Sequence, residues 1–375
     1  VLTKVLKDQR DLLTKYVNKD VTQVPQVFIP YKEVLDVYHA GLQVPDEVTL
    51  MWCDDNYGYI RHFPTAEERA RKGGNGVYYH VSYWGRPHDY LWLGTVHPSL
   101  VYQQMSLAYE RGIQKMWILN VGDIKPSEYQ IELFLDMAWN LEAVKQQGVV
   151  AHQRQFLERE FGLEVAAQLQ PVMQEAYRLA YIRKPEFMGN TRTEEKDPKF
   201  KIISDLPWSE QEIKERLTAY KQLSDKVEQE WHALPAQKKE TYFQLVKYPV
   251  QAAAQMNNKL LTAQLARHGK ADWADSDRAY DSIVSLTKRY NTTKWNRMMD
   301  FQPRRLPVFN RVERKALSSG LLEKPQAVYT WNGADCVEGA SVICEGLGYE
   351  GKAVAVEKKK ELTFEFAAWE TDSVE

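Results

Sequence analysis

Residues 48–56 read Val-Thr-Leu-Met-Trp-Cys-Asp-Asp-Asn, an apolar run that ends in two carboxylates and an amide. Three further runs, at 24–30, 77–83 and 115–120, have the same form, because each is apolar and carries polar, chemically capable side chains at or just beyond its end. Segments with helical spacing separate the runs, and repeated β–α units predict a parallel sheet. In a parallel α/β barrel the C-terminal strand ends face one common pocket. The pattern therefore predicts an active site at this edge.

The number of strands leaves two architectures open. A closed α/β barrel has eight strands, and only four are evident in the first 120 residues. The sheet is therefore either small and open, or the second half of a TIM-like (β/α)8 barrel whose first half lies on other sequence. The helical spacing at the start of the chain, with no strand before it, favours the half barrel. Helices are expected over residues 1–17, 34–39, 66–72, 98–111 and 127–146.

The character of the sequence changes twice after this α/β region. Long amphipathic segments with many charged residues predict a helical bundle, and short alternating runs then predict the start of a β-sandwich-like domain. We expect domains at 1–148, 149–324 and 325–375. The expected helices of the second domain are 153–161, 166–183, 209–234, 238–267 and 274–299, and the expected strands of the third are 327–331, 341–344, 353–356 and 362–367.

The composition excludes two classes of partner. The 375 residues carry a net charge of −2, whereas a protein that binds nucleic acid usually presents a basic stripe to the phosphates. No stretch approaches the ~20 apolar residues that cross a bilayer. We therefore expect neither nucleic acid nor a membrane as a partner.

Four carboxylates lie at predicted strand ends, namely Glu33, Asp54, Asp55 and Asp123. Glycoside hydrolysis uses two carboxyl groups, one protonated to assist the leaving oxygen and one ionised. A helix cap or an ion pair is the alternative explanation for each of the four. Asp55 and Asp123 fit that alternative especially well.

His80 and Tyr83 are the other reactive side chains of the third run. In a regular strand these two residues point to opposite faces, because successive side chains alternate. Both can face one pocket only if the strand ends or bulges near Ser82. A histidine buried in the core is the alternative for His80.

Other catalytic classes have weaker support. Catalytic metal sites usually need closely spaced histidines and carboxylates, but the histidines here are scattered. The glycine-rich turn at 73–76 lacks the dinucleotide-binding pattern and precedes a strand. The nucleophile elbow of serine esterases is absent from the sequence. We therefore expect no metal and no cofactor.

Three blocks of sequence, at 51–64, 73–87 and 117–126, resemble the α-glucuronidases of glycoside hydrolase family 115, and residues 31–34 and 44–46 fit the same pattern upstream. The blocks are long, unusual in composition and in the family's order. The resemblance implies a chain that starts inside the catalytic barrel and continues into a helical and a β-sandwich domain. It also implies removal of (4-O-methyl)glucuronic acid side chains from glucuronoxylan, with inversion at the anomeric carbon.

The resemblance also implies roles for individual residues. Glu33 and Asp54 would have catalytic roles, with Glu33 the first choice for an acid–base group. Asp54 would be either its catalytic partner or a pocket residue that holds sugar hydroxyls. A cation is needed for the substrate carboxylate. Arg61, Arg86 and Lys125 are candidates, and a residue outside this sequence is the alternative. The implied substrate-binding residues are Asn56, His80, Tyr83 and Asn120.

Two other functions stay open, a non-catalytic carbohydrate-binding protein on a degenerate barrel and a metal-dependent hydrolase. Xylan lies outside cells, so the substrate suggests a periplasmic or secreted protein. The helical segment, like the family, is compatible with a homodimer.

Overall fold

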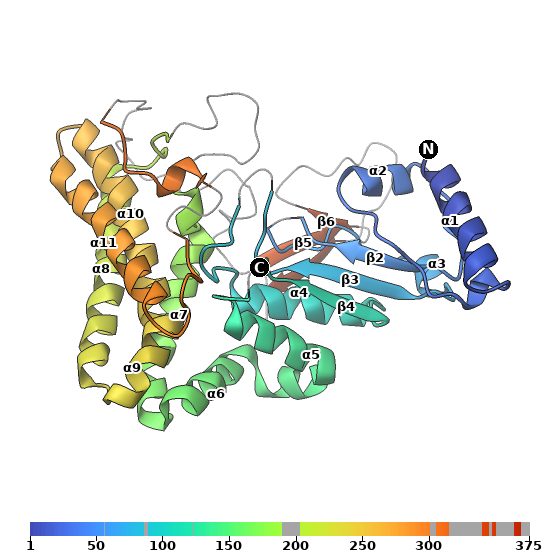
Figure 1. Ribbon diagram of the computed structural model, residues 1–375, viewed down its shortest axis with the longest axis horizontal. Helices are drawn as coiled ribbons and strands as arrows, with labels where there is room; N and C mark the ends of the chain where they lie inside the picture. The colour runs from blue at the N-terminus through green and yellow to red at the C-terminus, as the bar shows by residue number, and fades with distance from the viewer. Residues whose placement is uncertain are drawn as a thin grey trace.

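The structure, a computed structural model, places a parallel sheet and its helices beside a group of longer helices (Figure 1). Helix α1 (Leu2–Tyr16) lies at the end of the molecule opposite the longer helices, and none of its residues is buried. The structure describes residues 1–55, 57–85, 89–122, 124–189, 203–300 and 305–314, and the backbone of 340–344, 347–349 and 364–368.

The four predicted strands form one parallel sheet in the order β1-β2-β3-β4. The first strand is only two residues long, shorter than the predicted run at 24–30. Pro25 and Pro30 explain the difference, because proline has no N–H to donate to a strand ladder. The strands are β1 (Val27–Phe28), β2 (Thr49–Cys53), β3 (Asn75–His80) and β4 (Met116–Asn120).

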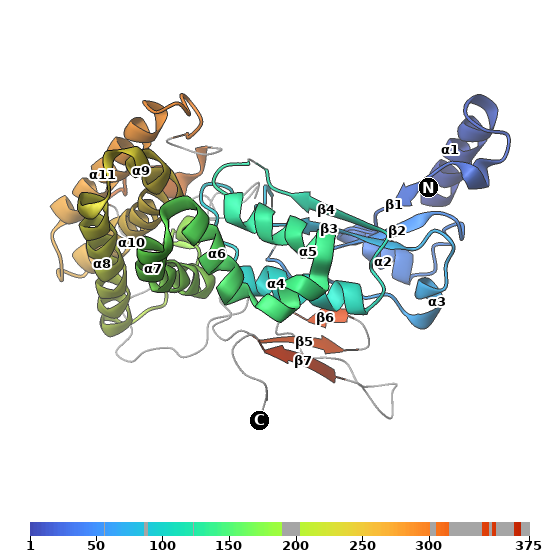
Figure 2. The ribbon, with the colours of Figure 1, turned by 90° about the horizontal axis from the view of Figure 1, so that it is seen from below.

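Sequential strand order determines where the connecting helices lie. Right-handed crossovers that always step in the same direction place every helix on the same face of the sheet. Figures 1 and 2 show α4 and α5 together on one side of the strands. The helices of this region are α2 (Glu33–His39), α3 (Ala66–Arg69), α4 (Pro98–Glu110) and α5 (Glu128–Gln147).

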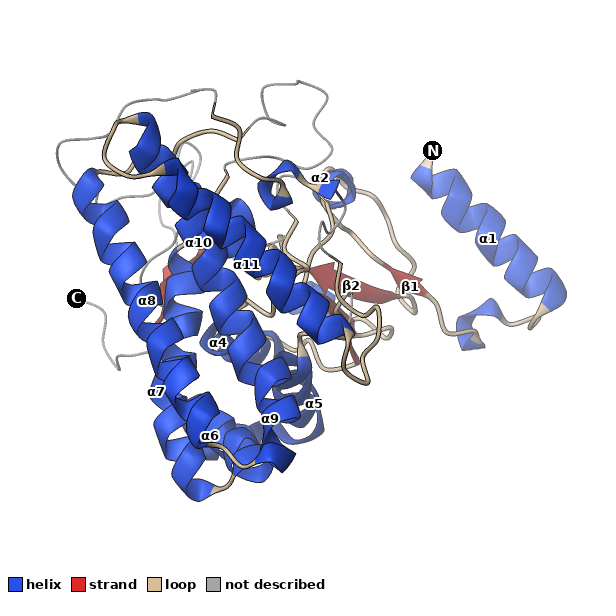
Figure 3. Ribbon diagram, turned by 60° about the vertical axis from the view of Figure 1, so that its left-hand side comes forward, coloured by secondary structure: helices blue, strands red, loops and turns tan. Residues whose placement is uncertain are grey.

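Long helices follow, as the sequence predicts, and α8, α10 and α11 run side by side (Figure 3). Among the described residues, no helix is both long and apolar enough to cross a membrane. The helices are α6 (Val149–Phe161), α7 (Leu163–Ile182), α8 (Glu210–Ala233), α9 (Ala236–Tyr242), α10 (Tyr248–Arg267) and α11 (Trp273–Asn291).

The prediction of a helix at 238–267 is confirmed, with a π-helical turn inside it, whereas the prediction of a helix that reaches residue 299 is wrong. Helix α9 ends at Tyr242, and a π-helical turn, Phe243–Lys247, separates it from α10. Pro249 in the first turn of α10 has no N–H for the preceding turn, and the wider π turn accommodates this loss. The other helix, α11, ends at Asn291.

Near the C-terminus, three strands form an antiparallel sheet in the order β6-β5-β7. This sheet matches the predicted strands at 341–344 and 362–367, whereas 327–331 and 353–356 lie outside the described residues. The β-sandwich therefore stays a prediction. The strands are β5 (Ala340–Cys344), β6 (Leu347–Tyr349) and β7 (Phe364–Ala368).

Buried aromatic contacts join the sheet region to the long helices. Trp92, in the connection between β3 and α4, donates a hydrogen bond from its indole to the Tyr248 hydroxyl at 3.2 Å. The hydroxyls of Tyr59 and Tyr181 lie 2.7 Å apart. Both pairs are buried, so the helices support the loops at the C-terminal edge of the sheet.

The carboxylate of Glu68 on α3 connects helix α2, the segment that follows β2 and the start of α3. Its carboxylate accepts hydrogen bonds from the Tyr38 hydroxyl and from Nε2 of His62, both at 2.8 Å, and from the Thr65 backbone amide. Nδ1 of His62 lies 3.0 Å from Nε2 of His39. Burial opposes ionisation, but the bonds from His62, Thr65 and Tyr38 together lower the pKa of Glu68 to about 2. Glu68 therefore fixes α2 against the sheet.

We expect Glu68→Gln to reduce the stability of the fold at pH 7. The carboxylate has a lower pKa in the folded state, so its contribution is complete above the unfolded value of 4.5 and is lost as pH falls toward 2. Urea unfolding should therefore show a wild-type advantage at pH 7 that shrinks by pH 3. Glu67→Gln, one exposed residue earlier on the same helix, is the matched control. An advantage that does not change with pH would contradict this role.

Candidate active site

A cavity of about 370 Å³ opens at the C-terminal ends of β1 and β2. Its volume lies in the usual range for small-molecule pockets. The cavity contains both predicted catalytic carboxylates, which come from different β–α connections. The lining residues are Pro30, Tyr31, Lys32, Glu33, Leu35, Asp36, Cys53, Asp54, Asp55 and Arg61.

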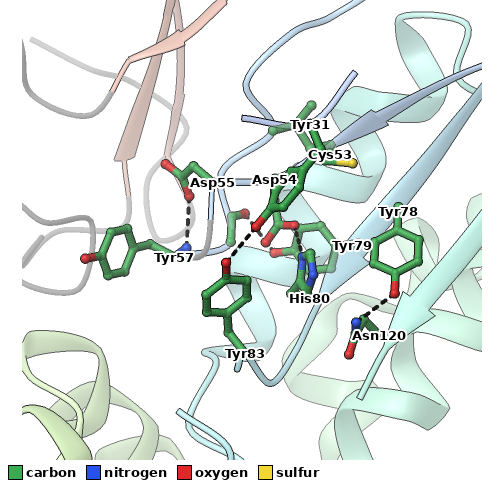
Figure 4. A network of polar contacts seen from close by, with 12 residues as sticks. Tyr31, Cys53, Asp54, Asp55, Tyr57, Tyr78, Tyr79, His80, Tyr83 and Asn120 are labelled. Atoms are coloured by element: carbon green, nitrogen blue, oxygen red, sulfur yellow. Dashed lines mark hydrogen bonds and ion pairs between the residues drawn. The ribbon is translucent and has the colours of Figure 1, made fainter. Parts of the chain in front are cut away.

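Asp54 and His80 form a buried pair at this edge. Parallel pairing aligns Cys53 with Tyr78, so the residues that end the two strands become neighbours. Nδ1 of His80 donates to Oδ1 of Asp54 at 2.5 Å, and the Asp54 side chain is fully buried (Figure 4). Oδ2 of Asp54 has no hydrogen-bond partner in the described part of the chain.

This geometry gives the two residues distinct capabilities. The carboxylate fixes the orientation of the imidazole by accepting from Nδ1–H, which leaves Nε2 as the nitrogen that can exchange a proton. Within the described residues, Nε2 of His80 makes no hydrogen bond. The second oxygen of Asp54 can accept from a water or a sugar hydroxyl.

Tyr83 lies on the same side as His80, which is possible only because the strand ends before Tyr83. Strand β3 ends at His80, and Tyr83 instead pairs through its backbone with Tyr90. The rings of His80 and Tyr83 lie 5.1 Å apart. The prediction that the strand ends before Tyr83 is therefore confirmed.

Tyr31 and Lys32 complete this cluster from the end of β1. The hydroxyls of Tyr31 and Tyr83 lie 2.8 Å apart (Figure 4). Nζ of Lys32 donates to the Tyr83 hydroxyl at 2.6 Å. Burial and the contact with Tyr83 raise the pKa of Tyr31 far above its usual value. Tyr31 thus stays protonated and able to donate at any physiological pH.

Glu33 is the first residue of α2 and lies exposed at the cavity wall. A carboxylate in the first turn of a helix is stabilised by the helix dipole. Its side chain has no hydrogen-bond partner in the described ranges. Glu33 is therefore accessible to a substrate and to solvent protons, in contrast to the buried Asp54.

Two other predicted residues hold the structure around the site. Asp55 accepts from the backbone amides of Tyr57 and Tyr59 at 2.9 and 3.2 Å, so it caps a turn, as one of its two interpretations proposed. Asn120 donates to the Tyr78 hydroxyl at 2.7 Å and accepts from the Gly122 amide. Asn120 thus contacts the ring beside His80, and its proposed role in binding substrate stays a prediction.

Several of the predicted site residues lie away from the cavity or outside the described residues. Asn56, Arg86 and Asp123 lie outside the described residues. Lys125 is paired with Glu128 at the start of α5. Of the two predicted cations that the structure describes, Arg61 lines the cavity, where its Nη1 lies 3.5 Å from Oδ2 of Asp55. The sequence analysis assigned no role to Tyr31 and Lys32, although they follow β1 in the same polar segment as Glu33.

The described residues contain no group of three or more histidine, cysteine or acidic side chains placed to hold a metal ion. Two of the scattered histidines have structural partners instead. His62 binds Glu68, and Nδ1 of His97 accepts from the Ser99 amide at the start of α4. Burial lowers the pKa of His97 to about 4, so this ring is neutral.

A sequential parallel sheet with two carboxylates, an imidazole and phenols at its C-terminal edge resembles the arrangement of α/β-barrel enzymes, and paired carboxylates are the groups that glycosidases use. A match to glycosyl hydrolase family 115 covers residues 1–187, and the chain belongs to this family. No curated protein matches the chain.

One solved structure shows how far the similarity extends. It is a 4-O-methyl-α-glucuronidase of the same family with specificity for decorated arabinogalactans, 69% identical to this chain with a TM-score of 0.84. The match covers 94% of this chain and 47% of that protein. The chain therefore spans about half the length of this relative.

The neighbouring aspartates should differ in their effect on stability. Asp54→Asn keeps an acceptor for His80 and removes a buried charge, so we expect a change below about 1 kcal/mol. Asp55→Ala leaves two turn amides without their acceptor and should cost about 1–3 kcal/mol. Urea unfolding of both variants measures the contrast. Equal losses would show that Asp54 has a structural role.

Proposed function

We propose that this chain carries the catalytic residues of a glycosidase that releases (4-O-methyl)glucuronic acid from polysaccharide side chains. The observation that carries the proposal is the cavity shared by an exposed Glu33 and a buried Asp54 that is bonded to His80. Family membership and the similarity to a 4-O-methyl-α-glucuronidase support it.

The two carboxylates suit different steps. Glu33 is accessible, so it can carry a proton between solvent and the glycosidic oxygen or the attacking water. Asp54 is held by His80, and its second oxygen, which has no partner among the described residues, can accept a hydrogen bond from the water or from a sugar hydroxyl. Hydrolysis with inversion would use the two groups on opposite sides of the anomeric carbon.

The sheet is best explained as half of a closed barrel. Sequential order with helices on one side is the arrangement that repeats around a TIM-like barrel. Strands β1 and β4 each pair on one side only within the described residues, so both edges can accept a further strand. The greater length of the similar structure supports this proposal. Further pocket residues would then come from outside these 375 residues.

Two polymers are candidate substrates. Glucuronoxylan follows from the resemblance in sequence. The similar solved structure acts on decorated arabinogalactans, which favours arabinogalactan as a second candidate. Both polymers lie outside cells, and we therefore propose an extracytoplasmic site of action.

A homodimer stays a proposal that size-exclusion chromatography with light scattering would test.

We expect Glu33→Gln and Asp54→Asn each to reduce the release of uronic acid by about 10²–10⁴-fold, the usual contribution of a general acid–base group. The assay follows free 4-O-methylglucuronic acid by proton NMR, with the full-length protein that contains this chain and with both polymers. The first anomer to appear decides between inversion and retention.

Glu110→Gln, an exposed change on α4, is the control and should retain full activity. Near-normal turnover by both catalytic variants would exclude the assigned residues. Binding of either polymer without hydrolysis would support a non-catalytic carbohydrate-binding protein instead.

Excess EDTA should leave the release of uronic acid unchanged, because the described residues of the cavity provide carboxylates and one adjacent imidazole rather than a metal-binding set. The comparison is the initial rate with and without chelator. Loss of activity that Zn²⁺ or Ca²⁺ restores would identify a metal-dependent hydrolase.

A further inference from the structure

Lys32 has an unusual backbone conformation at the cavity wall. Its φ is 51° and its ψ is −122°, between the end of β1 and the first residue of α2. A residue with a side chain is strained at such positive φ values, and such residues are concentrated at functional sites. The strain persists because Tyr31 and Tyr83 hold the side chain in place.

The ammonium group of Lys32 has neutral neighbours. Nζ donates to the Tyr83 hydroxyl at 2.6 Å and lies 5.2 Å from the ring centres of both Tyr31 and Tyr83. No carboxylate of the described residues forms an ion pair with it, although four acidic side chains line the same cavity. Its positive charge is therefore not neutralised by a neighbouring side chain.

A uronic acid brings its own carboxylate into this acidic cavity. Like charges close together raise the free energy of binding, so the site must provide a cation. Arg61 already faces Asp55 at 3.5 Å. Lys32 has three donors and uses one on Tyr83, which leaves two for a ligand. The Tyr31 hydroxyl lies 2.8 Å from the Tyr83 hydroxyl that this ammonium group contacts.

We propose that Lys32 binds the carboxylate of the uronic acid and thereby determines the preference for uronic acids over neutral sugars. The inference rests on the proposed function, because it names the group that selects the substrate of the same cavity. The strained backbone places the ammonium, the two tyrosines hold it, and the absence of an ion-pair partner among the described residues leaves its charge for the ligand.

The test compares two substrates that differ only at this carboxylate. One is a glucuronic acid–decorated xylo-oligosaccharide, and the other is the same compound with the carboxylate reduced to a hydroxymethyl group. For the full-length protein we expect Lys32→Met to lower kcat/KM on the acidic substrate by about 10–100-fold, the loss of one charge-assisted hydrogen bond. The rate on the reduced substrate should change little, so discrimination between the two falls.

Two further variants separate charge from structure. Lys32→Arg keeps the charge and should keep most of the discrimination. Lys72→Met removes an exposed lysine before β3, at the opposite edge of the sheet, and should behave as wild type. Equal losses on both substrates with Lys32→Met would overturn the inference, because Lys32 would then only support Tyr83.

Binding distinguishes a failure of this inference from a failure of the proposed function. Titration with free D-glucuronate and with D-glucose, followed by NMR line broadening, needs no turnover. Selective loss of glucuronate binding in Lys32→Met supports the role of Lys32 even in a protein that hydrolyses neither substrate. Unchanged glucuronate binding in this variant overturns it even in an active glycosidase.

Discussion

The parallel register between β2 and β3 is the constraint on which the site depends. It aligns Cys53 with Tyr78, so Asp54, one residue beyond Cys53, lies close to His80, two residues beyond Tyr78, and Oδ1 of Asp54 lies 2.5 Å from Nδ1 of His80. Because β3 then ends, Tyr83 can turn back to the same cluster. A shift of one residue would reverse the faces of all these side chains, since the side-chain period of a strand is two.

The buried carboxylate of Asp54 is costly for the fold and useful for chemistry. One of its oxygens has no partner in the described part of the protein, and an unsatisfied buried acceptor destabilises the native state. The aromatic core around β2 and β3, including Trp52 and Tyr79, excludes water and so strengthens electrostatic interactions within the site. Bound substrate would supply the missing partner.

The long helices contribute to the site through the segment that follows β3. Tyr90 pairs with Tyr83 along the backbone, and the two rings stack at 5.9 Å. On its other side Tyr90 contacts Phe187 at 6.3 Å, and Nζ of Lys184 lies 4.8 Å from its ring centre. These residues follow α7, so the helical region fixes the position of Tyr83. The α/β region alone would leave this segment without support.

The sequence by itself determined the elements and the chemical types at their ends, because apolar periodicity and the polar residues after each strand are local signals. It could not decide which neighbours meet. Asp54 and Asp55 are adjacent in sequence, yet one pairs with His80 and the other caps a turn. Lys32 was overlooked because its partner, Tyr83, lies 51 residues away. Only the tertiary structure decides such contacts, since strand register and chain reversal bring distant residues together.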